Sequence, residues 1–314
     1  MAKLETKATF DPDNVLLSDA KNGKVPEESG EIIIKEVVDT SLVSKLGKYE
    51  PMTKLKKQFT YLAEGPGAYW VNEAEKIQTS KAKWLQITME AHKIGVIIPV
   101  SKEFLKYTVS DFFTIIKPKV AESIQAKFDN AVLFGGTDSP FPQGISVAER
   151  ATTAGNVVSQ SDNPYIDIND MMALIEDADL EPQAIATTRS YNKDLRGALD
   201  GRNLPIFNGP RDGVTAEAVG LPIAYGNRKA WDKKQAVAFV GDFDNLIYGI
   251  PQGLEYSISE DATLTTIVGE DGGPINLFER DLVALKVTMY AAFLTVKDDA
   301  FALLKPKTEE KPAQ

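Results

Sequence analysis

The segment that most constrains the fold lies between two strand-like stretches. Residues 55–63 (LKKQFTYLA) alternate along the chain with the period of two that a β-strand requires, and residues 84–100 (WLQITMEAHKIGVIIPV) alternate again before ending in an apolar run. About twenty residues of Gly, Pro, charge and aromatics, EGPGAYWVNEAEKIQTSKAKW, join them. The pattern predicts a long β-hairpin. Because an isolated two-stranded hairpin is marginal in water, its aromatic side chains should pack on another surface.

The composition limits the functions open to such a chain. Its 314 residues, 43% of them hydrophobic and 25% charged, suit one large domain or two modest ones. The net charge of −10 argues against gripping nucleic acid by neutralising phosphates, which needs a clustered basic surface. The absence of cysteine excludes disulfides, zinc fingers and thiol nucleophiles, and indicates folding inside a cell. Without an N-terminal apolar signal region or a window of roughly eighteen apolar residues, we expect a soluble protein with no membrane partner.

The N-terminal part has the composition of an arm. Residues 1–30 are polar and rich in turn formers, with too few large apolar side chains to offset the entropy of ordering, so we expect a partner to order them. Apolar residues then recur at helical spacing from Ile34 to Leu46, and Gly47 follows where a C-terminal cap belongs. A short amphipathic helix therefore ends the arm.

The strongest helical signal covers residues 110–134. Apolar side chains recur every four residues and form a wide stripe along one face. Pro118 lies inside this pattern and predicts either a kink near 114–118 or a fresh helix start, and Gly135-Gly136 ends the helix. The residues expected to form the apolar stripe include Phe112, Phe113, Ile116, Val120, Ile124 and Phe128.

The remainder of the chain indicates a compact α/β unit followed by long strands. Helical patterns alternate with short apolar strand-like runs up to residue 241, which is typical of an α/β unit. A strand follows at 255–260, and two strand-like runs flank the turn GEDGG at 269–273. The predicted helices of the α/β unit are 166–179 and 190–200, and its strands are 183–188, 221–225 and 236–241.

Histidine chemistry is nearly absent. His92 is the single histidine, which excludes histidine-based triads and multi-histidine metal sites. Its alternation partners, Thr88 and Glu90, are polar, so the pattern places His92 on a solvated strand face.

The acidic residues offer a weak alternative. Asp242 and Asp244 in GDFD could pair as acid and base or hold a hard cation, and the same applies to the carboxylates of IEDAD at 175–179. Such spacing is nonspecific, because carboxylates at strand ends and on helix surfaces are usually solvated. GEDGG lacks the ligands of a calcium loop, and no nucleotide-binding or serine-hydrolase motif is present. We therefore expect no catalytic residue, no metal and no cofactor, and keep a carboxylate-dependent hydrolase as the rival from another class.

The order of parts, with several long segments, resembles a known family. The segments are LGKYEPM (46–52), GPGAYWVNEAEKIQTSKAKW (65–84), IGVIIPVSKEFLKYTVSDFF (94–113), GDFDNLIYGIP (241–251) and GGPINLFERDLVALKVTMYAAF (272–293). From about residue 11 to 305 the chain is similar to the major capsid proteins of tailed bacteriophages with the Hong Kong 97-type fold, most closely those of siphophages of Gram-positive hosts. The fold that this resemblance implies is α+β.

The resemblance also implies a division of the chain into parts. It comprises an N-terminal arm, an extended hairpin loop, a peripheral domain built on the long spine helix, an axial α/β domain and a C-terminal tail. Their bounds are 1–48 for the arm, 49–95 for the loop, 96–164 with 252–305 for the peripheral domain, 165–251 for the axial domain and 306–314 for the tail.

In that family the extended loop reaches over an adjacent subunit. The resemblance therefore places the loop residues Tyr69, Trp70, Lys76, Lys81, Lys83 and Trp84 at an intersubunit interface. The lysines are candidates for the loop lysine that the family's namesake cross-links, but no partner residue matches, so we predict no covalent cross-links.

The function implied is that of a shell protein without enzymatic activity. Copies would form pentamers and hexamers of an icosahedral virion shell, assembled in the host cytoplasm around double-stranded DNA that touches the lumen without specificity. Only about thirty polar residues precede the first helix, so a separate scaffolding protein is implied, along with a portal protein. An encapsulin-like compartment shell, which shares the fold but encloses a cargo enzyme, is the structural alternative.

Overall fold

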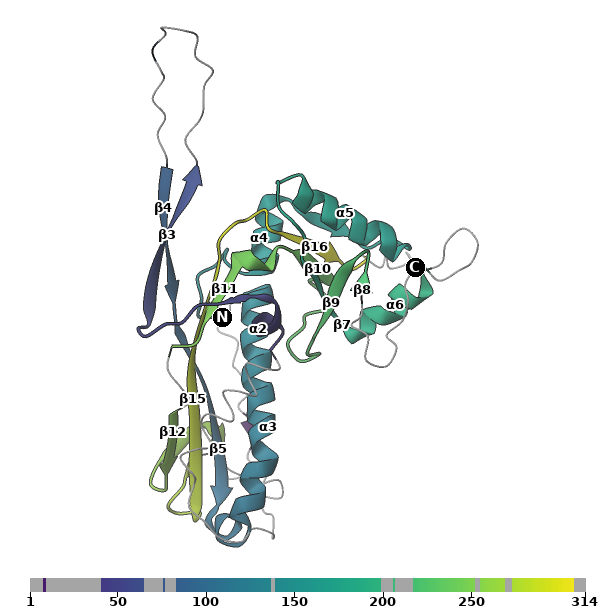
Figure 1. Cartoon of the computed structure of the whole chain (residues 1–314). Coiled ribbons are helices and arrows are strands. Elements are labelled where there is room, and N and C mark those ends of the chain that lie inside the picture. The colour runs from purple at the N-terminus through teal and green to yellow at the C-terminus, as the bar shows by residue number, and fades with distance from the viewer. Residues whose placement is uncertain are drawn as a thin grey trace.

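The computed structural model describes residues 8–9, 41–64, 76, 83–136, 139–198, 206, 217–251, 255–268 and 273–307. They form two lobes and a projecting hairpin (Figure 1). The ribbon lobe is built on the long helix α3 (Lys102–Phe134) and the strands beside it. The sheet lobe is a six-stranded sheet with helices on both sides.

The ribbon lobe owes its length to one strand pair. β15 (Leu282–Thr295) pairs antiparallel through Leu282–Ala291 with the whole of β5 (His92–Ser101), and β12 (Glu255–Ser259) pairs with the other edge of β15. Alternation puts the apolar side chains of β5 and β15 on one face, against α3. The facing sets are Ile94, Val96, Ile98, Leu285, Val287 and Met289 from the strands, and Ile116, Val120, Ile124 and Phe128 from the helix.

Shorter elements complete this lobe. β13 (Thr263–Val268) and β14 (Pro274–Asn276) pair antiparallel, and β1 (Ala8–Thr9) adds to β13 in parallel. Near the junction of the lobes, β2 (Lys48–Tyr49) pairs in parallel with β11 (Leu246–Gly249). β11 in turn pairs antiparallel with the end of β15.

The sheet lobe has the strand order β6-β16-β10-β7-β9-β8. Its central strands β16 (Phe301–Lys305), β10 (Ala238–Gly241) and β7 (Ala184–Thr188) alternate between two apolar faces. One face joins the core that contains the end of α3, and the other packs against α5 (Pro164–Glu176). The remaining elements are α4 (Val147–Ala154), β6 (Val157–Ser159), α6 (Asn192–Gly197), β8 (Glu217–Ala218), β9 (Leu221–Gly226) and the 3-10 helices Arg189–Tyr191 and Phe243–Asn245.

The two lobes share one continuous core. Phe134 at the end of α3 contacts the rings of Trp231 and Phe239, with centroid separations of 5.5 and 5.6 Å. The Trp231 indole also donates to the Ala236 carbonyl at 2.8 Å, which satisfies its buried N–H. Because the same cluster reaches β15 and the sheet lobe, the lobes should unfold together.

Most predicted elements are present, with two corrections. α3 begins at Lys102 and runs through Pro118 as one helix, so the predicted fresh start at Pro118 is wrong. Ile116, two residues before the proline, packs against the core, and burial of this helix face outweighs the hydrogen bond that proline lacks. Of the helix predicted between Ile34 and Leu46, the described part is α2 (Leu42–Leu46), closed by Gly47 as expected. The arm is not ordered only by a partner, since Ala8–Thr9 pair with this chain's own β13.

His92 lies on the opposite side from the one predicted. It is partly buried, meets the Phe141 ring edge-on at 4.8 Å, and its Nε2 finds no hydrogen-bond partner among the described residues. In β4 (Lys83–Glu90), where the hairpin leaves the body, the side chains of even-numbered residues face solvent. In β5 the side chains of even-numbered residues face α3. Side chains alternate between two sides in both strands, as predicted, but tertiary packing decides which of the two sides is covered.

Candidate functional site

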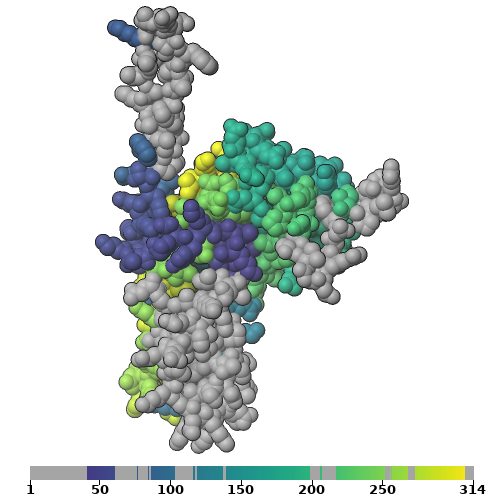
Figure 2. Space-filling view, in the orientation of Figure 1, coloured from purple at the N-terminus to yellow at the C-terminus, as the bar shows by residue number. Residues whose placement is uncertain are grey.

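The hairpin formed by β3 (Lys56–Glu64) and β4 projects from one side of the molecule (Figures 1 and 2). Among the described residues the two strands pair only with each other, from Lys56–Glu90 to Glu64–Lys83, with a shift of register between Leu62 and Glu64. A small cluster at the base, with Met52, Met89 and Ala292 buried, fixes the hairpin to the body. The described part of the hairpin beyond this base therefore has one neighbouring strand and little core of its own.

Ion pairs hold the base of the hairpin, one across its two strands and one to the segment that precedes it. Lys57 Nζ lies 2.5 Å from Glu50 and also donates to the Pro51 carbonyl at 2.9 Å. Lys56 pairs with Glu90 across the strands at 2.7 Å. The Lys56 hydrogen bond lowers the pKa of the Glu90 carboxyl below its usual value. These surface pairs orient the hairpin more than they stabilise the fold.

Trp84 is the exposed anchor of this hairpin. It lies near the outer end of β4, opposite Leu62, and 63% of its surface is accessible. A tryptophan so exposed is unusual in an isolated globular chain, because burial of its indole contributes more than that of almost any other side chain. The side chain is therefore available to a partner.

Of the other loop residues predicted at the interface, the structure describes only Lys76 and Lys83. Lys76 is exposed, and Lys83 opens β4 opposite Glu64. Tyr69, Trp70 and Lys81 lie outside the described residues. Their place at an interface stays a prediction.

The residues predicted for the spine-helix core lie on α3. Val120, Ile124 and Phe128 are buried and Ile116 packs against the same cluster. The side chains of Phe112 and Phe113 lie outside the described set, although both belong to α3.

The root of the arm is seated on α3 by a buried carboxylate that the sequence did not reveal. Asp129, 1% exposed, accepts hydrogen bonds from the Ser41 hydroxyl at 2.5 Å and from the Leu42 and Val43 amides at 2.9 and 3.4 Å. Those amides begin α2 and have no partner within the helix. Asp129 thus caps α2 from another element, while Leu42 and Val43 enter the main core.

Burial makes the ionisation of Asp129 a determinant of stability. Desolvation raises the pKa of Asp129, and the hydrogen bonds from Ser41, Leu42 and Val43 offset this only in part. Between the unfolded pKa, about 3.9, and the raised folded pKa, the folded chain holds a proton that the unfolded chain has lost. The stability that this group contributes is therefore present below that window and is lost as the pH rises through it.

This sign gives a pH prediction. Asp129→Asn cannot ionise, so the unfolding free energy of the native protein minus that of the variant should fall as the pH rises above about 4, then become constant. Urea unfolding of both proteins at successive pH values measures this difference. A difference that rises with pH, or does not change, would show that Asp129 is not the buried acid described here.

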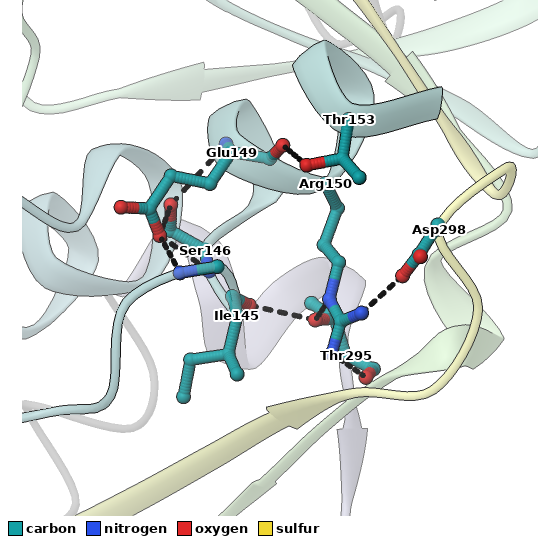
Figure 3. A network of polar contacts seen from close by, with 8 residues as sticks. Ile145, Ser146, Glu149, Arg150, Thr153, Thr295 and Asp298 are labelled. Atoms are coloured by element: carbon teal, nitrogen blue, oxygen red, sulfur yellow. Dashed lines mark hydrogen bonds and ion pairs between the residues drawn. The ribbon is translucent and has the colours of Figure 1, made fainter. Parts of the chain in front are cut away.

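A second polar cluster joins the lobes (Figure 3). Arg150 of α4 donates through Nε to the Thr295 hydroxyl at 3.0 Å and pairs through Nη1 with Asp298, beyond the end of β15. Thr295 in turn donates to the Ile145 carbonyl at 2.6 Å. Ser146 and Glu149 form a capping box that starts α4. The cluster fixes α4, and with it the sheet lobe, to the end of the long ribbon.

Arg150→Ala should lower the unfolding free energy by about 2 kcal/mol, because it removes charge-assisted bonds and leaves the buried Thr295 hydroxyl one donor short. Arg150→Lys should lower the unfolding free energy by about half as much, since lysine keeps the positive charge but lacks the several donors of the planar guanidinium. Lys307→Ala, which breaks an exposed pair with Asp162 at 2.8 Å, is the matched control and should change stability by less than about 0.5 kcal/mol. Urea unfolding compares the three, and equal losses would contradict the cluster's role.

The candidate catalytic carboxylates Asp242 and Asp244 both accept hydrogen bonds from neighbouring groups. Asp242 accepts from the Asp244 amide at 3.1 Å and from the Asn245 side chain at 2.8 Å, which caps a 3-10 turn, and Asp244 accepts from Gln183 at 2.8 Å. Burial is the main cause that raises the pKa of Asp242. Glu176, Asp177 and Asp179 are exposed at the end of α5. Among the described residues no group of three acidic, histidine or cysteine side chains could hold a metal ion.

Comparison with known proteins identifies the family of this chain. Residues 23–305 match the phage capsid family. The chain is also 42% identical over 309 residues to the major capsid protein of Staphylococcus phage 80alpha, covering 97% of this chain and 93% of the relative. The chain belongs to the phage capsid family. A more distant member, the probable major capsid protein of Mycobacterium phage D29, is 25% identical and covers 90% of both chains.

Solved structures confirm the capsid fold. A chain of Microbacterium phage Oxtober96 superposes with a TM-score of 0.73 at 26% identity, over 94% of this chain and 97% of that one. A chain from the capsid of the empty GTA particle, solved with C5 symmetry, gives a TM-score of 0.62 at 12% identity over 93% and 94% of the two chains. The resemblance drawn from the sequence and the α+β Hong Kong 97-like fold are thus confirmed.

Membership of this family makes the chain a structural component of a phage capsid, and hence of the virion. Within the described residues, no helix is both long and apolar enough to span a membrane.

Proposed function

We propose that this capsid protein assembles with copies of itself into the pentamers and hexamers of an icosahedral shell around double-stranded DNA. The observation that carries the proposal is the hairpin: it projects from the body, pairs with no third strand, and exposes 63% of Trp84. A surface of this kind becomes stable when a second copy covers it. Repeated heterologous contacts whose rotation closes give rings.

The domain division follows the same reasoning. The ribbon lobe would correspond to most of the peripheral domain (96–164 and 252–305), the sheet lobe to the axial domain (165–251) together with β6 and β16 from those two segments, and the hairpin to the extended loop (49–95). Support comes from the separate apolar face of the sheet against α5 and from the long β5–β15 ribbon against α3. The arm (1–48) and tail (306–314) would lie at the contacts between copies.

The further partners remain part of the proposal. A separate scaffolding protein and a portal protein would direct assembly in the host cytoplasm. An acidic chain of net charge −10 suits a container for DNA, since a basic lumen would bind the packaged phosphates to the wall. We expect non-specific contact with the DNA and no covalent cross-links between subunits.

The two rivals receive less support. An encapsulin-like compartment would share the fold, but the similar proteins come from phages. A carboxylate-dependent hydrolase would need Asp242 and Asp244 free for chemistry, whereas both are engaged in capping and side-chain hydrogen bonds. Asp242→Asn with Asp244→Asn would abolish turnover in a hydrolase but only alter assembly or stability in a shell protein.

Electron microscopy of the expressed protein tests the proposal. Closed shells or rings of five and six copies are expected, with a scaffolding partner supplied if the chain alone stays dispersed. Light scattering that detects only monomers under every assembly condition, with and without the scaffolding partner, would overturn it.

A further inference from the structure

An open cavity of about 870 Å³ lies on the α4 side of the sheet lobe. Three parts of the chain line it: α4, the end of β16 with the residues that follow, and the turn that precedes β10. Ala148 of α4 and Leu303 of β16 belong to the core cluster on this side of the sheet, whereas α5 covers the other side. The cavity thus belongs to the sheet lobe and is separate from the projecting hairpin.

Lysine is the only charged residue type that is exposed in the described lining of this cavity. The exposed lining residues include Lys234, Lys305 and Lys307, and the neutral polar residues Ser159 and Gln235. Three lysines that share one concave surface form a local excess of positive charge in a chain whose net charge is −10. A concave surface of one charge sign attracts ligands of the opposite sign, so we expect this lysine cavity to bind an anion.

The carboxylates next to the lysine cavity leave this charge largely available. Glu149 lines the cavity but is only partly exposed, and its Oε2 accepts from the Ser146 hydroxyl at 2.7 Å at the start of α4 (Figure 3). The positive end of the helix dipole balances part of its charge there. Lys307 pairs with Asp162 at 2.8 Å, but both side chains are exposed, so this pair contributes little and Lys307 can exchange it for another anion.

The lining favours a phosphate group over an acidic protein segment. Protein segments bind mainly through an aromatic or aliphatic anchor that fills an apolar pocket. None of the exposed lining residues is apolar, because Ala148 and Leu303 are buried. Ammonium groups together with hydroxyl and amide donors, such as those of Ser159 and Gln235, are the groups that contact sugar-phosphate backbones.

The same lining indicates a contact that does not read the base sequence. The described lining contains no arginine and no aromatic side chain, the residue types that recognise base edges or stack on bases. Three lysines can neutralise two to three phosphates, so binding should weaken roughly 10- to 40-fold when the salt concentration rises from 50 to 200 mM. A contact of this strength would touch DNA without immobilising it.

We propose that the lysine cavity is a phosphate site that contacts the backbone of the enclosed double-stranded DNA. The lysines bind phosphate oxygens from outside the duplex, and the α4 side of the sheet lobe faces the lumen. The inference extends the proposed function and rests on it, since it needs a shell that encloses DNA.

Charge reversal tests the site on the free subunit. Fluorescence anisotropy at about 50 mM salt measures binding of a labelled duplex of about twenty base pairs. The combined variant Lys234→Glu, Lys305→Glu and Lys307→Glu should bind at least about tenfold more weakly than the native chain, because it loses two to three phosphate contacts. No binding by the native chain under these conditions would overturn the inference.

A second triple variant controls for overall charge. Lys54→Glu, Lys127→Glu and Lys193→Glu change the net charge by the same amount at exposed positions outside the cavity, so this variant should keep most of the binding. Circular dichroism checks that both variants are folded. Equal losses in the two variants would overturn the inference, because overall charge alone would then explain the binding.

Two competitors identify the chemistry of the ligand. Unlabelled duplex should displace the labelled duplex at a much lower charge concentration than polyglutamate or inorganic phosphate. Polyglutamate that competes as well as the duplex would assign the cavity to an acidic protein segment, and inorganic phosphate that does so would assign it to free phosphate. Either result would overturn the inference.

Lysine acetylation in assembled shells is the closing experiment. DNA-filled shells, and the same shells after their DNA has been released, are treated with a small acetylating reagent, and mass spectrometry measures the modification of each lysine. The three cavity lysines should be modified severalfold less in the filled shells, whereas Lys54 should be modified equally in both. Equal modification of the cavity lysines would overturn the inference and leave the proposed function standing. Absence of shells by electron microscopy would instead remove the proposed function, and the inference with it.

Discussion

Closing the hairpin early should abolish shell formation while leaving the subunit folded. Glu64 and Lys83 are opposite each other, so residues 65–82 can be replaced by Asn-Gly, a two-residue turn that matches the twist of the strands. The base cluster around Met89 and Ala292 remains intact, so the thermal midpoint should shift by no more than about 2 °C. Most of the loop residues expected at the interface, Tyr69, Trp70, Lys76 and Lys81, are lost, whereas Trp84 is kept. Analytical ultracentrifugation and electron microscopy, with thermal unfolding of the same sample, measure both effects.

A matched control separates the hairpin's contacts from its charge. Lys54→Ala removes one exposed lysine just before the hairpin and leaves the length of the hairpin unchanged. Because a single exposed charge contributes little, this variant should form shells at nearly the wild-type protein concentration. Shells from the shortened chain, with unchanged size and yield, would show that the hairpin is not an assembly element.

Asp129→Ala should cost about as much stability as truncating a large side chain of the described core. It removes the acceptor for Ser41 and for the Leu42 and Val43 amides, which are left buried without a partner, so only the Ser41 cap on the Ser44 amide remains at the start of α2. Each unsatisfied buried group costs about 1–3 kcal/mol, so a loss of about 3–4 kcal/mol is expected. Urea unfolding followed by circular dichroism measures it.

Two further variants define the mechanism of that loss. Asp129→Asn keeps one acceptor oxygen but turns an amide toward backbone donors, and should lose about 1–2 kcal/mol at neutral pH. Glu181→Ala removes a carboxylate from an exposed position and should change stability by less than about 0.5 kcal/mol. If Asp129→Ala were no more harmful than Glu181→Ala, α2 would not depend on Asp129.

The hairpin and the long helix could be predicted because their signals are local. Strand alternation around residues 55–63 and 84–100 is visible within a few residues, and it corresponds to β3, β4 and β5. The apolar stripe of α3 likewise repeats along one helix. Exposed Trp84 was singled out by residue type, since a tryptophan beside charges and a Gly-Pro-Gly turn must be covered by something.

The seat of the arm could not be predicted because its partners are far apart in sequence. Asp129 and Ser41 are separated by 88 positions, and nothing near Asp129 distinguishes it from a solvated helix carboxylate. The sequence offers only a weak signal for this contact. Asp129 is an acidic residue within the apolar stripe of a helix, and Ser41 lies three residues before Ser44 at the start of another. The β1–β13 pairing involves two residues of each strand and leaves no local pattern.

His92 shows a related limit. Alternation identified which residues share a side of the strand, but which side is covered depends on α3 and Phe141, which alternation does not describe. Tertiary packing, not strand propensity, decided this position.

The measurement that tests the account most directly is the accessibility of Trp84 in assembled shells. Acrylamide quenching of the native protein and of Trp84→Phe, each as free subunits and as shells, isolates the emission of this residue by difference, and Trp231 is already buried in the free chain. We expect Trp84 emission to move to shorter wavelength and to become strongly protected from acrylamide on assembly. Emission and quenching that are the same in shells and free subunits would contradict the claim that sister copies cover the hairpin.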